Sequence, residues 1–465
     1  MPGRGDFLLE SVEGGEVRGR YSLLGLDPDL VFRASEAEAQ INRQWRHSRD
    51  AFEPCDGDAM AELRALANAC RIDVPDALPS ALACLVGYFG YETIGLVESL
   101  PRADASELAL PDMLFVRPTL ILVFDRLSDE LFCVAPLWPD GDAPADPEKA
   151  ILAAGERIDE ALRTLSSSAP SEPRAPVDVP TPKLDPVLAG EDYKAMVARA
   201  KDYIVAGDIF QVVLAQRFTC PFTLPPLELY RALRRVNPSP FLYFLDLPGF
   251  AIVGSSPEIL VRVRDGEVTI RPIAGTRPRG ANRSEDEANE ASLLADPKER
   301  AEHLMLLDLG RNDVGRVTSQ GSVAVTDSFG IERYSHVMHI VSNVIGALSD
   351  DKDALDALFA GFPAGTVSGA PKIRACEIIA ELEPETRGAY AGGVGYFAPD
   401  GSVDSCIVLR TAVVKDEVMH VQAGAGIVAD SDPDYELAEC RAKAGALFAA
   451  ASEAVRRASE ARFGQ

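Results

Sequence analysis

The 465-residue chain is too long for one small core and allows two or three domains of ~150 residues, or one large composite fold. Hydrophobic residues make up 47% of it and charged residues 25%, which excludes a mainly disordered protein. The formal net charge of −26 would repel a phosphate backbone and argues against a nucleic-acid partner. Such an excess of carboxylates favours solubility, and some of them are candidates for holding a divalent cation.

The eight cysteines are scattered singly, without the spacing of a zinc site or of a disulfide framework. This distribution is typical of thiols buried in a reducing cytoplasm. Residues 1–9 hold no signal-peptide core, and no apolar run reaches the ~18 residues that span a bilayer. We therefore expect a cytoplasmic protein without a membrane partner.

The first clear boundary along the chain is a segment rich in proline, serine and alanine at 166–186. Such a composition is typical of a flexible surface linker, and a helix is predicted just before it, over 147–165. We expect this linker to separate an N-terminal part, 1–165, from a larger C-terminal part, 187–465.

The C-terminal part alternates hairpins with helices. A helix is predicted over 191–206, where apolar residues share one face and Gly207 suits the stop. Strands are predicted over 210–218, 241–247, 250–254, 259–264, 267–274, 393–397, 403–414 and 418–423. Short turns such as Asp265-Gly266 indicate antiparallel pairing, so the predicted class is α+β. No dinucleotide or Walker motif is present, and a nucleotide cofactor is not indicated.

Two predicted helices begin with the same Asp-Pro pair. Asp296 and Asp432 are expected N-caps, and the prolines that follow suit the first helical position. In both helices two glutamates three residues apart share a face. These pairs are Glu299 with Glu302 and Glu436 with Glu439.

One Glu-x-x-Glu pair alone is usually a solvated helix face with favourable charge near the helix N-terminus. Glu299 also stands where a capping-box glutamate belongs, which strengthens that interpretation for it. Two matched pairs, each near a glycine-rich segment or a basic loop, favour a second interpretation. Carboxylates of both helices would hold Mg²⁺ through one or two direct bonds, and substrate oxygens and water would complete the shell.

Three segments combine glycine, small hydroxyls and single cations: 271–280, 362–372 and 422–427. Bare backbone amides at such turns bind carboxylates, Thr276 and Thr366 add hydroxyl donors, and Arg410 can grip a carboxylate with two bonds. Each segment alone is explained equally well by a tight turn that needs glycine. Together with an acidic metal site they indicate a small polyanionic substrate. By residue type alone, His339 would be an ordinary core histidine and Glu258 an exposed strand-edge residue.

The sequence resembles the chorismate-utilising enzymes, and within them most closely the large subunits of anthranilate synthase, component I. The resemblance rests on ordered motifs at 272–280, 298–305, 308–315, 362–372, 423–427 and 435–444. Segments 8–15 and 237–240 also look like the family's tryptophan-binding motifs. The resemblance implies one interlaced fold of two antiparallel sheets packed together, with helices outside. It also implies conversion of chorismate and ammonia to anthranilate and pyruvate, with Mg²⁺, in tryptophan biosynthesis.

The resemblance assigns roles to individual residues. Glu302 and Glu439 match metal ligands, Glu299 and Glu436 match supporting carboxylates, and Glu258 matches a general acid for the departing C4 hydroxyl. His339 matches a histidine of the pyruvate-elimination half. Substrate-binding positions are matched by Gly275, Thr276, Thr366, Tyr396, Arg410, Gly424, Gly426 and Lys443. The tryptophan site is matched by Glu10, Ser11, Asn237, Pro238, Ser239, Pro240 and Phe241.

Two positions discriminate between members of the family. Water-using relatives resemble one another in a lysine base where this chain has Gln211, and a neutral amide suits an amine donor because it cannot deprotonate water. Many aminodeoxychorismate synthases carry a lysine nucleophile where this chain has Ala274. The nearest alternative is therefore an aminodeoxychorismate synthase of the alanine type. A more distant one is a non-catalytic subunit that only binds an amino acid.

The resemblance further implies a separate glutamine amidotransferase subunit and inhibition by L-tryptophan. A free amino acid needs a partner for its ammonium group, donors for its carboxylate and an apolar slot for its ring. Glu10, Ser11 and the pair Phe241-Leu242 supply those types if the fold brings the two segments together. The family often has Tyr-Met at 241–242, so the strength of this inhibition is left open.

Overall fold

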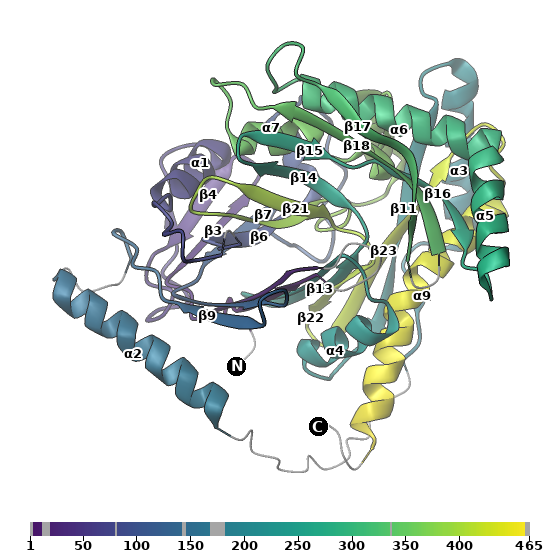
Figure 1. The fold of residues 1–465 in the computed structure, drawn as a ribbon. Coiled ribbons are helices and arrows are strands. Elements are labelled where there is room, and N and C mark those ends of the chain that lie inside the picture. Colours follow the sequence, from purple (N-terminus) through teal and green to yellow (C-terminus); the bar gives the residue numbers. More distant parts are fainter. Residues whose placement is uncertain are drawn as a thin grey trace.

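The computed structural model describes residues 3–11, 19–79, 81–141, 146–167, 182–334 and 337–460. Two large antiparallel sheets face one another, and helices lie around them (Figure 1). Every strand pairing within the described residues is antiparallel. The predicted class and architecture are confirmed.

The first sheet has eleven strands in the described residues. Its order is β10 (Asp185–Pro186), β11 (Gln211–Pro221), β23 (Val418–Ile427), β22 (Thr411–Lys415), β13 (Phe250–Ser256), β12 (Phe241–Leu247), β1 (Phe7–Glu10), β2 (Tyr21–Leu26), β8 (Leu120–Asp125) and β9 (Glu130–Val134), and β19 (Gly369–Ala370) pairs with β11.

The second sheet has twelve strands in the same part of the chain. Its order is β16 (Ile273–Pro278), β18 (Val337–Ala347), β15 (Glu267–Ile270), β14 (Ile259–Arg264), β21 (Val403–Ile407), β20 (Gly393–Phe397), β6 (Leu85–Phe89), β7 (Met113–Arg117), β3 (Leu30–Ser35), β4 (Glu38–Asn42) and β5 (Glu53–Pro54), and β17 (Ala324–Arg333) pairs with β18.

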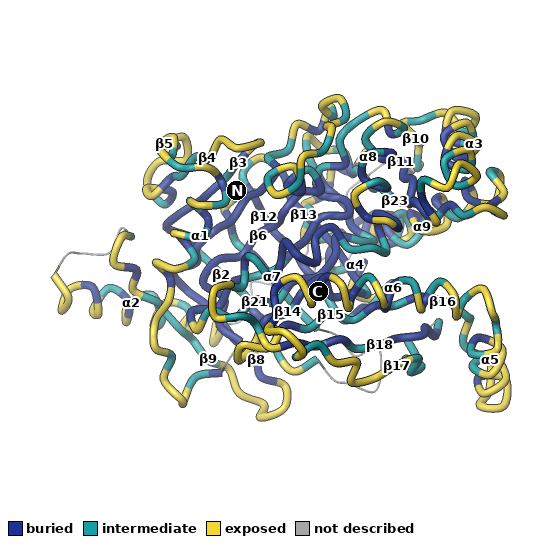
Figure 2. Tube along the Cα trace, turned by 90° about the horizontal axis from the view of Figure 1, so that it is seen from above, coloured by how far each residue is buried: buried dark blue, intermediate teal, exposed yellow. Residues whose placement is uncertain are grey.

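The helices surround these sheets. They are α1 (Ala59–Ala69), α2 (Pro147–Ser166), α3 (Gly190–Ala206), α4 (Pro226–Val236), α5 (Arg283–Ala295), α6 (Pro297–Gly315), α7 (Ala354–Gly361), α8 (Lys372–Leu382) and α9 (Pro433–Ala458), with short 3₁₀ turns η1 (Tyr91–Leu96) and η2 (Gly365–Val367). Figure 2 shows buried strands at the centre, whereas α2 and α5 project outward with largely exposed surfaces. No helix in the described residues is both long and apolar enough to cross a membrane.

Strands from both ends of the chain are interleaved in each sheet. In the first sheet β1 pairs with β12, so that Phe7 lies opposite Leu245. In the second, β6 pairs with β20. One hydrophobic cluster joins Phe7 of the first sheet to Val86 and Val394 of the second. The division of the chain at 166–186 stays a prediction, and residues 168–181 lie outside the described residues.

Two strands predicted as continuous are divided in the structure. Residues 267–274 split into β15 and β16 around Pro272, which has no N–H to donate to a ladder. Residues 403–414 split into β21 and β22, because Arg410 has a left-handed backbone (φ 47°) that ends the extended run. β21 belongs to the second sheet and β22 to the first. Arg410 therefore lies where the chain passes between the sheets.

Candidate active site

The two Asp-Pro helices begin as predicted. The Asp296 carboxylate accepts from the N–H groups of Lys298 at 2.9 Å and Glu299 at 3.4 Å. Asp432 caps α9 in the same way. Helix α6 packs on β16 and β18 of the second sheet, whereas α9 packs on β23 of the first. The two helices that carry the glutamate pairs therefore pack against different sheets (Figure 1).

The charges of glutamates on the two helices interact with one another. Burial raises the pKa of the Glu302 carboxyl, and Glu299 on its own helix and Glu439 on the other helix raise it further. Burial also raises the pKa of Glu436, with a contribution from Glu439. Four carboxylates thus form one anionic centre that a cation would stabilise.

Basic side chains already neutralise part of this centre. Lys443 Nζ lies 2.7 Å from Glu439 Oε1 and donates to Gly424 O at 2.9 Å. Arg277 bonds Glu299 at 2.9 Å and Asp296 at 2.7 Å. Glu302 has neither a hydrogen-bond partner nor an ion-pair partner among the described residues, so its carboxylate is available.

The carboxylate donors are of the type that binds Mg²⁺, although they do not form a closed coordination site in this structure. In the described part of the chain, no three His, Cys, Asp or Glu side chains converge closely enough to hold a metal ion. Mg²⁺ is commonly held by one or two carboxylates and otherwise by substrate and water. Glu302, with the Glu439 carboxylate opposite, meets that requirement.

Glu258 is buried, contrary to what its residue type suggests. It directly follows Ser256 and Pro257 at the end of β13, and its side chain accepts a hydrogen bond from Thr366 Oγ1 at 3.2 Å. Burial raises the pKa of Glu258 to about 8, although the Thr366 bond lowers it in part. At neutral pH this carboxyl is mostly protonated and can give up a proton.

His339 lies opposite Thr276 in the pairing of β18 with β16. Its Nδ1 lies 2.9 Å from Gly275 O and 3.2 Å from Thr276 Oγ1. Because a carbonyl only accepts, Nδ1 carries the proton and Nε2 has the lone pair. Burial lowers the pKa of His339, so the ring is neutral at physiological pH.

Glycine is required where backbone and side chains approach closely. A Cβ on Gly426 would lie 2.6 Å from Gln211 Nε2, and one on Gly424 would lie 2.8 Å from the Tyr390 hydroxyl. Gly275 has φ +70°, and a Cβ there would lie 3.0 Å from Glu299 Oε2. The three glycine positions predicted to bind substrate thus adjoin other site residues.

Arg410 is half-buried, and its guanidinium has no hydrogen-bond or ion-pair partner among the described residues. Burial lowers the pKa of this guanidinium, but the group remains a cation at neutral pH. A partly buried arginine without an acidic partner suits the carboxylate of a ligand.

Tyr390 is the site residue that sequence reasoning missed. It is buried, and its hydroxyl lies beside Gly424. The available signal was an aromatic residue directly before Ala391-Gly392-Gly393, where Ala391 has a left-handed backbone (φ 62°). A non-glycine residue in this conformation is uncommon, and such residues cluster at functional sites.

A second region, away from the carboxylates, contains a cavity of about 620 Å³. Tyr396 lines this cavity rather than lying with the other predicted substrate-binding residues. Glu10, Ser11, Pro240 and Phe241 line it as well. The pairing of β1 with β12, which places Glu10 opposite Leu242, brings the two predicted tryptophan segments together.

The partners of Glu10 restrict what it can bind. Its carboxylate already accepts from Tyr230 at 2.5 Å and Arg234 at 2.8 Å, and Arg126 lies 3.4 Å away. Ser11 lines the cavity, and its carbonyl accepts from Arg126.

The remaining predicted tryptophan residues form the turn before β12. Asn237 O accepts from Ser255 Oγ at 2.5 Å, Ser239 is buried, and Pro238 lies between them. The Asn237 side-chain nitrogen is buried with no partner among the described residues. This turn leads directly into Pro240 and Phe241 at the cavity.

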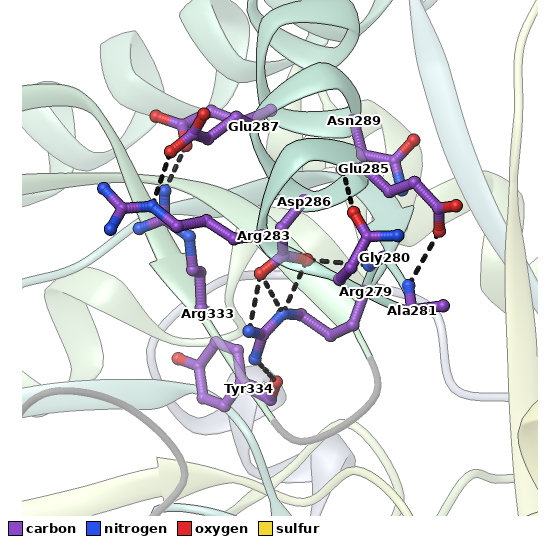
Figure 3. A network of polar contacts seen from close by, with 12 residues as sticks. Arg279, Gly280, Ala281, Arg283, Glu285, Asp286, Glu287, Asn289, Arg333 and Tyr334 are labelled. Carbon is purple, nitrogen blue, oxygen red and sulfur yellow. Dashed lines mark hydrogen bonds and ion pairs between the residues drawn. The ribbon is translucent and has the colours of Figure 1, made fainter.

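The loop after β16 is held by a polar network, shown in Figure 3. Arg279 bonds both carboxylate oxygens of Asp286 and donates to Tyr334 O at 2.7 Å, and Gly280 N–H donates to Asp286 at 2.7 Å. The ring of Tyr334 lies against His339, with centroids 5.5 Å apart, and also lines the large cavity. The network therefore fixes a residue that contacts both regions.

Comparison with known proteins gives a consistent result. A family described as chorismate binding enzyme matches residues 6–449. A protein from Cereibacter sphaeroides named anthranilate synthase component 1 is 54% identical over 448 residues, which are 96% of this chain and 89% of that one. One of the same name from Pseudomonas putida is 47% identical over 455 residues, again 96% and 89% of the two chains.

Solved structures resemble this one as well. Anthranilate synthase component I from Streptococcus pneumoniae superposes with a TM-score of 0.82 at 36% identity, covering 94% of both chains. The isochorismate synthase MenF from Escherichia coli superposes with a TM-score of 0.70 at 21% identity, covering 96% of this chain and 88% of its own, which shows the fold alone.

Proposed function

Because the chain belongs to the chorismate binding enzymes, we propose that it is the large subunit of an anthranilate synthase. The reaction joins chorismate and ammonia to give anthranilate and pyruvate, the first step of tryptophan biosynthesis. The observation that carries the proposal is the buried Glu258 carboxyl, protonated at neutral pH and oriented by Thr366. An acid of this kind is what loss of a hydroxyl group as water requires.

In the first half of the reaction a new carbon–nitrogen bond forms as the C4 carbon–oxygen bond breaks. Glu258 gives its proton to the departing oxygen, which leaves as water. Gln211, beside Gly426, is a neutral amide and does not act as a base toward water. Ammonia brings its own lone pair, so this site suits an amine nucleophile.

In the second half the ring loses a proton and the enolpyruvyl group leaves as pyruvate. The neutral ring of His339, whose Nε2 has no hydrogen-bond partner among the described residues, is placed to handle a proton in this step. Substrate carboxylates would be held by Arg410, by Lys443 and by the amides of the Gly424–Gly426 segment, and Tyr390 would close one side.

We further propose Mg²⁺ as the cofactor. Glu302 and Glu439 would hold it, and Glu299 and Glu436 would support them. When bound, the ion supplies a positive charge that neutralises substrate carboxylate charge.

The nitrogen source in the cell is proposed to be a separate glutamine amidotransferase subunit. The relatives are named component 1, which implies a second component. The protein is proposed to work in the cytoplasm, consistent with eight cysteines that are all free thiols in the structure.

Feedback by L-tryptophan is the regulatory part of the proposal. The cavity of about 620 Å³ offers hydroxyl and apolar groups from both predicted segments. Because the Glu10 carboxylate is already bound by Arg234 and Tyr230, the amino-acid ammonium would need another acceptor, such as a backbone carbonyl.

The test of the catalytic proposal is to mix the isolated protein with chorismate, Mg²⁺ and ammonium chloride at about pH 8, where free ammonia is present and part of the Glu258 carboxyl is still protonated. We expect anthranilate fluorescence, and no turnover with glutamine as the only nitrogen donor. Formation of 4-amino-4-deoxychorismate would favour the alternative of an aminodeoxychorismate synthase of the alanine type. No chorismate consumption would contradict an enzymatic function.

A further inference from the structure

Arg387 is a buried arginine in the turn that follows α8, and all of its bonding partners are buried too. Its Nε donates to Glu383 Oε2 at 2.8 Å, and its Nη2 bonds Glu383 Oε1 at 2.5 Å. Glu383 also accepts from the N–H of Ala215 at 2.8 Å. Both members of this ion pair are almost fully buried, at 3% and 5% exposure.

The rest of the guanidinium reaches two backbone carbonyls. Nη1 donates to Val367 O and Nη2 to Val213 O, each at 2.8 Å. Val367 directly follows Thr366, whose hydroxyl orients Glu258. Val213 lies opposite Gly426 in the pairing of β11 with β23. Two segments of the candidate site are thus tied to one side chain.

A third segment is held by ring contact. The guanidinium carbon lies 5.6 Å from the centroid of the Tyr390 ring and 4.7 Å from that of Tyr91 on η1. The Tyr390 hydroxyl adjoins Gly424. The cation therefore restrains the aromatic residue that sequence reasoning missed.

Stability alone does not account for such an arrangement. Removing two charges from water is expensive, and an apolar pair of the same volume is often equally stable. What a planar guanidinium adds is geometry, because its five donors point in fixed directions. Lysine carries the same charge but has three donors on a single nitrogen, so it cannot reproduce the four bonds that Arg387 makes from three nitrogens.

We propose that Arg387 is a positioning residue, which fixes the Thr366 turn, the Gly424–Gly426 strand and Tyr390 relative to one another. It touches neither the reacting atoms nor the predicted metal ligands in this structure. The proposal rests on the chorismate reaction proposed above.

The experiment compares Arg387→Lys with Arg117→Lys. Arg117 is a matched control because it is completely buried and paired with Asp29 at 2.8 Å. It lies on β7 of the second sheet, whereas the Val213 carbonyl that Arg387 bonds belongs to β11 of the first sheet. Thermal unfolding should show a similar loss of stability in both variants. Per folded molecule, Arg387→Lys should lower kcat about 10²-fold while KM for chorismate changes by less than about threefold, and Arg117→Lys should change neither.

A pH profile separates positioning from mere folding. Glu258 works as an acid while protonated, so kcat at a fixed concentration of free ammonia should fall as pH rises through about 8. The Thr366 bond lowers that pKa, so a loosened Thr366 turn moves the alkaline limb to higher pH. We expect this shift in Arg387→Lys and not in Arg117→Lys.

Glu383→Gln is the second variant, because it keeps an oxygen that can accept from Ala215 while weakening the hold on Arg387. It should show the same changes to a smaller degree, and it decides the question if Arg387→Lys does not fold.

An unchanged kcat and an unchanged alkaline limb in a folded variant would overturn the positioning role, as would an equal loss in Arg117→Lys. If the unaltered protein does not turn over chorismate, the proposed function itself has failed.

Discussion

Glu258 owes its proposed chemistry to its surroundings rather than to its residue type. A glutamate at the end of a strand is usually exposed and ionised, but this one is buried and has a single hydroxyl donor, Thr366. With the pKa raised to about 8, the carboxyl keeps a proton that it can give up at neutral pH. No pattern in the sequence shows this burial, because it arises when β13, η2 and β16 come together.

Replacing Glu258 by Gln should lower kcat by about 10²–10⁴-fold, the usual contribution of a positioned acid. Chorismate affinity should be nearly unchanged, since the neutral amide resembles the protonated carboxyl. Stopped-flow turnover and equilibrium binding of chorismate measure the two quantities. A variant that loses only affinity would show that Glu258 is not the acid.

The carboxylate centre gives a second prediction at this scale. Glu302→Gln and Glu439→Gln should each abolish turnover at modest Mg²⁺ and weaken Mg²⁺ binding measured by calorimetry, because each removes a hard anionic ligand. Asp308→Asn, an exposed change on the same α6 helix, is the control and should retain both. Unchanged Mg²⁺ affinity in the two glutamate variants would contradict the metal assignment.

At the scale of single elements, sequence patterns predicted most of what the structure shows. Caps, prolines and hairpin turns place α6, α9 and β12 to β14 within a few residues, because those signals are local. The patterns failed at Arg410, where one predicted strand divides between two sheets. They also could not separate Tyr396, which lines the large cavity, from Tyr390, which adjoins Gly424. The residues that a strand side chain contacts depend on the sheet that packs against it, which the local sequence pattern does not give.

Two glycine substitutions, one on the strand β23 and one on the helix α9, compare a closely packed position with an open one. Gly424→Ala places a methyl group 2.8 Å from the Tyr390 hydroxyl and 2.9 Å from Leu214 O, so kcat/KM for chorismate should fall at least about tenfold. Gly445→Ala, in the middle of α9 with nothing within 4 Å, should raise the free energy of unfolding by up to about 1 kcal/mol. Chemical denaturation and steady-state kinetics on both variants check this. Full activity in Gly424→Ala would mean that the strand tolerates the methyl group.

At the scale of the whole molecule, the proposed regulatory cavity and the proposed active site share structural elements. Tyr334 lines the cavity and also lies against His339, and Arg279 holds its backbone. A ligand in the cavity can inhibit only by binding the less active state more tightly. A ligand that displaces Tyr334 in the cavity would also move a ring that is packed on His339.

Ser11→Ala should relieve inhibition by tryptophan and leave uninhibited turnover nearly unchanged, because Ser11 lines the cavity but not the carboxylate centre. The coupling free energy at issue is typically about 1–3 kcal/mol, so the inhibitor concentration for half activity should rise about tenfold or more. Ser35→Ala, an exposed change on β3, is the control. Equal inhibition in both variants would place the regulatory site elsewhere, and no inhibition of the unaltered protein would contradict the proposed feedback.

The pairing of β1 with β12 also has a consequence for biosynthesis of the protein. Phe7 leaves the ribosome early, but its partner Leu245 follows more than two hundred residues later. Contacts this distant in sequence slow folding and leave early strands without partners meanwhile. The N-terminal strand β1, which carries the cavity residue Glu10, therefore stays without this partner until the chain has been made as far as β12. A point substitution could therefore remove the proposed response to tryptophan, whereas removal of β1 would also leave β12 without this partner.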